Sequence, residues 1–80
     1  MEYSTPSHMA ARAIRIHLAA RDETIEQLSE AIGLAHSTLK RRLLGVSPFN
    51  VNELHLIAGH FDVTIADVLK SPFEANVIAA

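Results

Sequence analysis

Residues 24–45 read TIEQLSEAIGLAHSTLKRRLLG, and the rest of the chain is arranged around this segment. Apolar residues in its first half recur on one helical face: Ile25, Leu28 and Ile32. This spacing predicts a short amphipathic helix that Thr24 caps. Gly33 follows the last apolar position, where its freedom to adopt a left-handed conformation lets the chain turn sharply.

A second short helix is predicted over residues 36–44. Leu39 and Leu43 are four residues apart and point inward, whereas several polar residues lie largely outside that apolar face. These are His36, Ser37, Lys40 and Arg41. Two short helices joined by a glycine turn of about three or four residues form a helix-turn-helix. The second helix of the pair carries the exposed cations.

The pair resembles the helix-turn-helix of phage lambda repressor/Cro (XRE-type) transcription regulators in three segments: Gln27-Leu28, Gly33-Leu34 and His36-Ser37-Thr38-Leu39. The residues that follow are similar to the version common in actinobacterial and actinophage regulators: Arg41-Arg42-Leu43-Leu44-Gly45, Pro48-Phe49, Glu53-Leu54 and Ile57-Ala58. The resemblance covers roughly residues 13–69 and implies an all-α, five-helix, lambda-repressor-like DNA-binding domain. Arg42 stands where the family often has an aliphatic residue, so Leu43 is expected to anchor the second helix instead.

Three further helices complete the predicted fold. The first spans about residues 6–21. Asn50 with Glu53 predicts a capping box at the start of the next helix. Thr64 with Asp67 repeats this capping pattern before a last short helix.

The buried side chains expected in this fold form one core. They are Ile14, Leu18, Leu28, Ile32, Leu34, Leu39, Leu43, Leu54, Ile57, Phe61, Ile65 and Val68. Leu69 is expected to point inward beside them. His17 belongs to the buried face of the first helix, as a residue tolerated at the boundary of that face. The chain is thereby divided into a flexible lead over residues 1–9, a helix-turn-helix domain over 10–70 and a tail over 71–80. The apolar tail has three open interpretations: disorder, docking on its own core, or pairing with a second subunit.

Composition limits the class of protein. The chain has 80 residues, enough for one domain with a marginal core, and no cysteine, which excludes disulfides and thiolate metal sites. It has neither a membrane-spanning apolar run nor a secretion signal, so we expect a soluble, cytoplasmic protein. The resemblance implies that the cytoplasm is that of a bacterial host. His55 and His60 fall on different helical faces, and no catalytic constellation can be named. We therefore expect no metal, no cofactor and no enzymatic activity.

Charge is unevenly distributed along the chain. The net charge of −2 taken alone argues mildly against a nucleic-acid binder. However, residues 10–21 carry three arginines and no acid, residues 22–33 four acids and no cation, and residues 34–46 three cations and no acid. One basic stripe among acidic surfaces can steer a polyanion into a single orientation.

The outward face of the second helix is the candidate for reading bases, because Arg and Lys in the major groove can donate to guanine O6 and N7. The predicted base contacts are His36, Ser37, Thr38, Lys40 and Arg41. The alternative for Lys40 and Arg41 is a solvated position near a helix C-terminus. The alternative for His36 and Ser37 is capping, because Ala35 has no capping oxygen.

Predicted phosphate contacts lie mainly at helix amino ends or in the adjoining loop, where backbone N–H groups and short polar side chains suit phosphate. They are Thr24, Gln27, Arg42, Ser47, Asn50 and Asn52. Capping alone also accounts for Thr24 and Asn50.

Together, the residues and the resemblance predict a sequence-specific regulator of transcription that inserts residues 36–44 into the major groove of double-stranded DNA. The resemblance implies a Cro-type or immunity-type repressor of a phage or prophage, which occludes RNA polymerase at an operator and binds a palindrome as a homodimer. The residues themselves leave monomer or dimer open, with the tail as one dimer contact. The alternative is a protein-interaction module of antitoxin or antirepressor type, favoured by the acidic net charge and the apolar tail.

Overall fold

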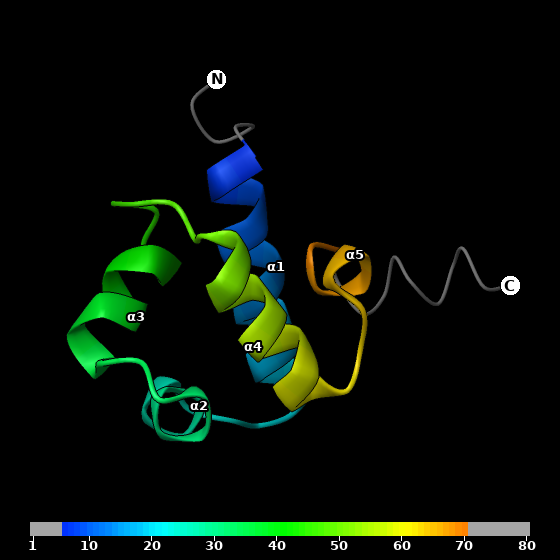
Figure 1. Ribbon diagram of the computed structural model, residues 1–80, viewed down its shortest axis with the longest axis horizontal. Helices are drawn as coiled ribbons and strands as arrows, with labels where there is room; N and C mark the ends of the chain where they lie inside the picture. The colour runs from blue at the N-terminus through cyan, green and yellow to red at the C-terminus, as the bar shows by residue number, and fades with distance from the viewer. Residues whose placement is uncertain (1–5, 71–80) are drawn as a thin grey trace, which may run out of the picture.

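The computed structural model describes residues 6–70 of the chain. Five α-helices make up this part: α1 (Pro6–Ala20), α2 (Ile25–Ile32), α3 (His36–Leu43), α4 (Val51–Phe61) and α5 (Ile65–Val68). No strand occurs between residues 6 and 70, so the predicted all-α, five-helix fold is confirmed. Figure 1 shows α4 passing in front of α1, with α2 and α3 on one side of this pair and α5 on the other.

The helix ends lie close to the predicted ones. Residues 6–9 form the first turn of α1, although the predicted division of the chain places them in the lead. Helix α3 ends one residue early because Leu44 is its C-cap. The remaining lead and the tail over 71–80 lie outside the described residues. Within the described part, no helix is long and apolar enough to cross a membrane.

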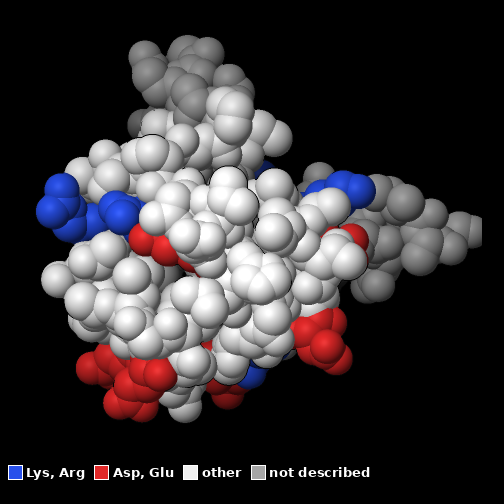
Figure 2. All heavy atoms as spheres, viewed as in Figure 1, with Lys and Arg blue, Asp and Glu red and all other residues white. Residues whose placement is uncertain are grey.

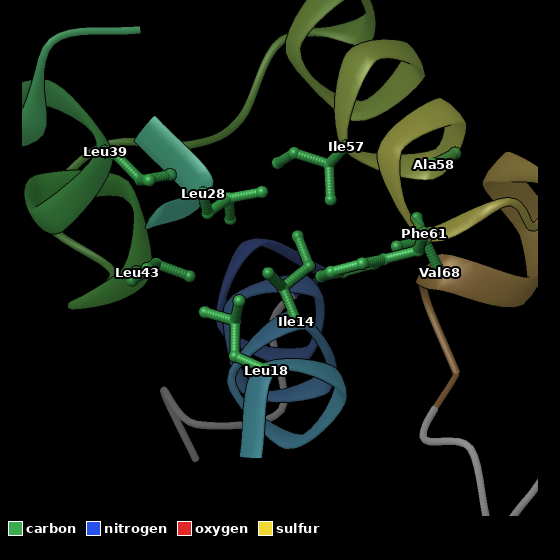
Figure 3. Close-up of a cluster of buried hydrophobic side chains, with 9 residues drawn as sticks. All are labelled: Ile14, Leu18, Leu28, Leu39, Leu43, Ile57, Ala58, Phe61 and Val68. Atoms are coloured by element: carbon green, nitrogen blue, oxygen red, sulfur yellow. The ribbon is translucent and has the colours of Figure 1, made fainter. Parts of the chain in front are cut away.

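Side chains from all five helices converge on one core (Figure 3). Its buried members are Ile14, Leu18, Leu28, Leu39, Leu43, Ile57, Ala58, Phe61 and Val68. Four other predicted core residues are only partly buried and pack against this cluster: Ile32, Leu34, Leu54 and Ile65. The expectation for Leu69 is wrong, since this side chain is 40% exposed. Helix α5 ends at Val68, so Leu69 is its C-cap and does not continue the buried face.

The turn between α2 and α3 has the geometry that the glycine predicts. Gly33 has φ 73° and ψ 25°, in the left-handed region. The backbone N–H groups of Gly33 and Leu34 both donate to the carbonyl of Ser29, at 3.0 and 3.1 Å. These two bonds satisfy the Ser29 carbonyl in the last turn of α2 and fix the direction in which α3 begins.

His17 is buried, as its place on the inward face of α1 predicts, and lies deeper than the boundary of that face. It holds α5 against α1. Its Nε2 donates to the carbonyl of Lys70 at 2.7 Å and lies 3.2 Å from the carbonyl of Asp67. Because a carbonyl only accepts, Nε2 carries the proton, and Nδ1 accepts from Arg21 Nη1 at 3.1 Å. The imidazole also stacks on Phe61, with ring centroids 5.4 Å apart.

Candidate nucleic-acid interface

Helix α3 is held by its apolar face and by its last carbonyl. Leu39 and Leu43 are 0% and 1% exposed, which confirms that Leu43 is the anchor at this end of the helix. Arg15 of α1 donates from Nη1 to the carbonyl of Leu43. A cation at this carbonyl satisfies an acceptor that the helix leaves unpaired and complements the negative end of its dipole.

The opposite face of α3 carries the predicted base contacts. His36, Ser37, Lys40 and Arg41 are exposed, and Thr38 is half-buried. Within residues 6–70, these five side chains make no hydrogen bond and no ion pair. The face is therefore free to meet a ligand without breaking an internal contact.

The amino end of α3 has no side-chain cap. Its N-cap is Ala35, and no side chain accepts from the first-turn N–H groups. The capping alternative for His36 and Ser37 is thus not realised in this structure. Orphan N–H groups at a helix amino end suit an anionic acceptor such as phosphate.

The two helices of the central pair carry opposite charges on their exposed faces. Figure 2 shows lysine and arginine atoms gathered over α3 at the left of the view, and acidic atoms over α2 at the lower left. Glu26 and Glu30 of α2 are exposed, as are Lys40 and Arg41 of α3. A polyanion is accordingly attracted to α3 and repelled from the outer face of α2.

An open polar hollow of about 590 Å³ lies between α2 and the amino end of α3. It brings together three of the predicted contacts, Thr24, Gln27 and His36. Glu26, Ser29 and Glu30 complete its lining, and its two carboxylates disfavour phosphate inside it. Lys40 and Arg41 lie outside this hollow, toward the carboxyl end of α3.

Five of the six predicted phosphate contacts have internal hydrogen bonds through their side chains. Thr24 and Gln27 form a reciprocal capping box, in which the Gln27 N–H donates to Thr24 Oγ1 at 3.1 Å and the Thr24 N–H to Gln27 Oε1 at 2.9 Å. Asn50 caps α4, as predicted, by accepting from the Glu53 N–H at 2.7 Å. Ser47 Oγ accepts from Arg42. Capping therefore explains why Thr24 and Asn50 stand at these positions, without any contact to DNA. Asn52 is exposed.

Arg42 differs from its neighbour Arg41 because its guanidinium is engaged inside the protein. Its Nε lies 3.0 Å from Glu53 Oε1 and its Nη2 3.2 Å from Glu53 Oε2, while Nη1 donates to Ser47 Oγ at 3.0 Å. This pairing joins the end of α3 to the start of α4. A phosphate contact by Arg42 would have to compete with Glu53, so the structure gives Arg42 a bracing role that its sequence position does not reveal.

The same pairing perturbs the acidity of Glu53. Burial raises the pKa of this carboxyl, but hydrogen bonds from Arg42 and from the backbone of Asn50 lower it more, and the resulting pKa lies below its ordinary value. The Glu53 hydrogen bond also raises the pKa of Arg42. Glu53 is thus ionised throughout the neutral range and keeps both its cap and its ion pair.

One signal in the sequence could have revealed more of these contacts. The Thr-x-x-Gln spacing of Thr24 and Gln27 is itself a capping-box pattern, which accounts for Gln27 without phosphate. The pairing of Arg42 with Glu53, eleven residues apart, follows no local spacing rule and depends on how the loop folds.

Comparison with known proteins assigns the chain to a family. The family model of the BetR domain matches residues 7–76, which is most of the chain. No curated protein and no solved structure gives a significant match. This match by itself does not confirm the resemblance to the lambda repressor/Cro family. By the length of this match, the chain belongs to the BetR domain family, whose small helical domains are commonly of the helix-turn-helix type.

Proposed function

We propose that this protein is a sequence-specific, double-stranded DNA-binding regulator of transcription that inserts α3 into the major groove. The observation that carries the proposal is the state of α3. Its inner face is fully buried at Leu39 and Leu43, while Lys40 and Arg41 on its outer face are exposed and unpaired within residues 6–70. Major-groove recognition requires a rigid helix whose outer face carries hydrogen-bond donors without internal partners.

In this proposal, the two ends of α3 have different tasks. Lys40 and Arg41 donate to guanine O6 and N7, and His36 and Ser37 meet base edges near the amino end, with Thr38 beside them. The orphan N–H groups of α3, together with Asn52, contact the sugar-phosphate backbone and fix the register of the helix. Arg42 supports this face indirectly, through its ion pair with Glu53.

The finer features of the proposal rest on the resemblance to lambda repressor/Cro-type (XRE-type) proteins. On this basis we propose a Cro-type or immunity-type repressor of a phage or prophage, which acts in the host cytoplasm by blocking RNA polymerase at an operator. The same resemblance favours a homodimer on a palindromic site. The protein would then act by occupancy alone, with no enzymatic activity.

Selection from a pool of random DNA duplexes tests the proposal. The purified chain is incubated with the pool at low salt, and the retained duplexes are sequenced. An enriched motif supports the reading of bases, with a palindrome indicating a dimer and an asymmetric motif a monomer. A wild-type protein that enriches nothing at low salt would remove the basis of the proposal.

A protein-interaction module of antitoxin or antirepressor type is the second candidate. It is favoured by the largely uncharged surface over α4 (Figure 2), where Val51 and Leu56 are 72% and 46% exposed. Salt separates the two functions. DNA affinity should fall steeply, with a log–log slope of about −0.9 per neutralised phosphate, whereas an apolar interface should change little between the same salt concentrations.

A further inference from the structure

An apolar groove lies at the end of the bundle formed by the amino end of α1. Its volume is about 190 Å³. Six apolar residues from four parts of the chain line it: Pro6, Ala10, Pro48, Phe49, Leu54 and Leu69. Phe49 and Leu54 are half-buried and Leu69 is 40% exposed, so an apolar occupant would remove further surface of all three from water.

The groove is not part of the candidate DNA interface. None of the predicted base contacts lines it, and α3 contributes no residue to it. Its presence is therefore unexplained by the proposed function, and the inference below holds whether or not the protein binds DNA.

The chain itself supplies a candidate occupant. Residues 71–80, SPFEANVIAA, begin directly after Lys70, and Leu69 forms part of the wall of the groove. His17 fixes this starting point, because its Nε2 donates to the carbonyl of Lys70 at 2.7 Å. Phe73 is only four residues beyond Leu69. Fully extended, four residues span about 13 to 14 Å.

The size of the groove suits one aromatic ring. An apolar protein cavity of about 150 Å³ is known to accept benzene. A groove of about 190 Å³ can thus receive the ring of Phe73, the one aromatic side chain of residues 71–80.

The family match covers part of the C-terminal segment, residues 71–80, but not the first residues of the chain. The BetR domain match begins at residue 7 and continues to residue 76, beyond the last described helix. It therefore includes Phe73 but excludes residues 1–5, the segment that precedes the groove residue Pro6 in the sequence. The pattern shared across the family treats residues 71–76 as part of the domain.

From these observations we infer that the groove is a docking site for the chain's own C-terminal segment, with the Phe73 ring as the anchor. Docking there also braces the loop that leads into α4, because Pro48 and Phe49 form one wall of the groove. The tail thus completes the apolar core of a small domain and holds the loop before the Asn50 cap.

Nuclear magnetic resonance on the full chain tests the inference. Nuclear Overhauser effects are expected between the ring protons of Phe73 and the methyl groups of Leu54 and Leu69. The Phe73→Ala variant should lose these effects and shift the Leu54 and Leu69 methyl resonances. Ile78→Ala, in the same segment but beyond the family match, is the matched control and should leave those resonances in place.

Three results would overturn the inference. The first is the absence of effects between Phe73 and the groove while the Leu28 and Leu39 methyl resonances report a folded core. The second is a set of effects from Tyr3, which would make the amino-terminal lead the occupant. The third is effects that appear only between differently labelled molecules in a mixed sample, which would make the occupant the segment of a second copy.

Discussion

Arg41 and Arg42 are adjacent in the sequence, yet the structure separates their roles. Arg41 is exposed and makes no hydrogen bond or ion pair with another described side chain, whereas Arg42 is bound to both Glu53 and Ser47. Only an unpaired guanidinium can bind a base without first giving up an internal partner. The assignment of base reading therefore falls on Arg41 rather than on Arg42.

Replacing Arg41 with Ala should weaken binding to the selected DNA site by about 1 to 3 kcal/mol and relax the preference at one base pair. The physical reason is the loss of a bidentate contact to guanine. Fluorescence anisotropy on single-base variants of the site measures both effects. Lys70→Ala is the matched control, because it removes one exposed charge beyond α5, outside the α3 face. Equal weakening on all DNA sequences would show that Arg41 contacts only phosphate.

Replacing Glu53 with Gln should lower stability in a pH-dependent way. The pKa of Glu53 is below its ordinary value in the folded protein, so the carboxylate stabilises the fold above the unfolded pKa of about 4.3. This contribution is lost as the pH falls through the lower, folded pKa. Wild type should exceed Glu53→Gln in free energy of unfolding at pH 7, and the difference should shrink below about pH 4.3. Urea denaturation at several pH values measures this difference in the free energy of unfolding. A difference that grows on acidification would contradict the assigned ion pair.

Several side-chain roles were out of reach of the sequence because their partners are distant along the chain. Arg15 caps a carbonyl 28 residues away, and His17 binds carbonyls 50 and 53 residues away. A polar residue on an otherwise apolar face gives no sign of which backbone group will satisfy it. The base-reading candidates could be predicted from the sequence, because helical spacing alone placed Lys40 and Arg41 outside the apolar face.

The helix ends differ in how clearly the sequence signals them. Capping residues and apolar spacing act within a few positions, so the limits of α2 and α4 follow from Thr24, Gly33 and Asn50. The end of α5 was harder to predict. Leu69 fits the apolar pattern but follows the last helical residue, and the helix of four residues is too short for its spacing to decide.

Helix α3 owes its position to its buried leucines, so Leu39→Ala should cost about 2 to 5 kcal/mol of folding stability. Leu39 is 0% exposed, and removing its side chain leaves a cavity beneath the proposed recognition face. Leu44→Ala is the matched control, since Leu44 is 62% exposed and should change stability little. Thermal or urea denaturation compares the two. Similar stability losses for both variants would mean that α3 is rotated about its axis from the orientation described.

Gly33→Ala should destabilise the protein by about 1 to 2 kcal/mol, the usual cost of a left-handed conformation for a residue with a Cβ. Gly33 has φ +73°, and a Cβ added there would meet no atom within 4 Å, so the cost comes from the backbone and not from a clash. Gly33→Asn should cost less, because asparagine tolerates this conformation better. Urea denaturation of both variants measures the difference. Equal stability of the alanine variant and wild type would show that the turn does not require the left-handed form.

The molecule as a whole combines a negative net charge with a basic face. Its net charge is −2, but lysine and arginine atoms lie over α3 and acidic atoms lie over α2 (Figure 2). The overall sum therefore conceals an electrostatic orientation that favours approach of DNA to α3. The sequence already showed this separation as alternating blocks of charge. Three-dimensional structure was needed to show that Arg42 belongs to the internal ion pair and not to the free cations.

Mapping the DNA contact surface by amide chemical shifts would test most directly whether α3 is the reading element. The isotopically labelled full chain would be titrated with a duplex recovered from the random pool. The account predicts that the largest shift changes fall on residues 36–41, with smaller ones at the amino ends of α2 and α4. Largest changes on the outer face of α4, around Val51 and Leu56, with α3 unaffected, would contradict it.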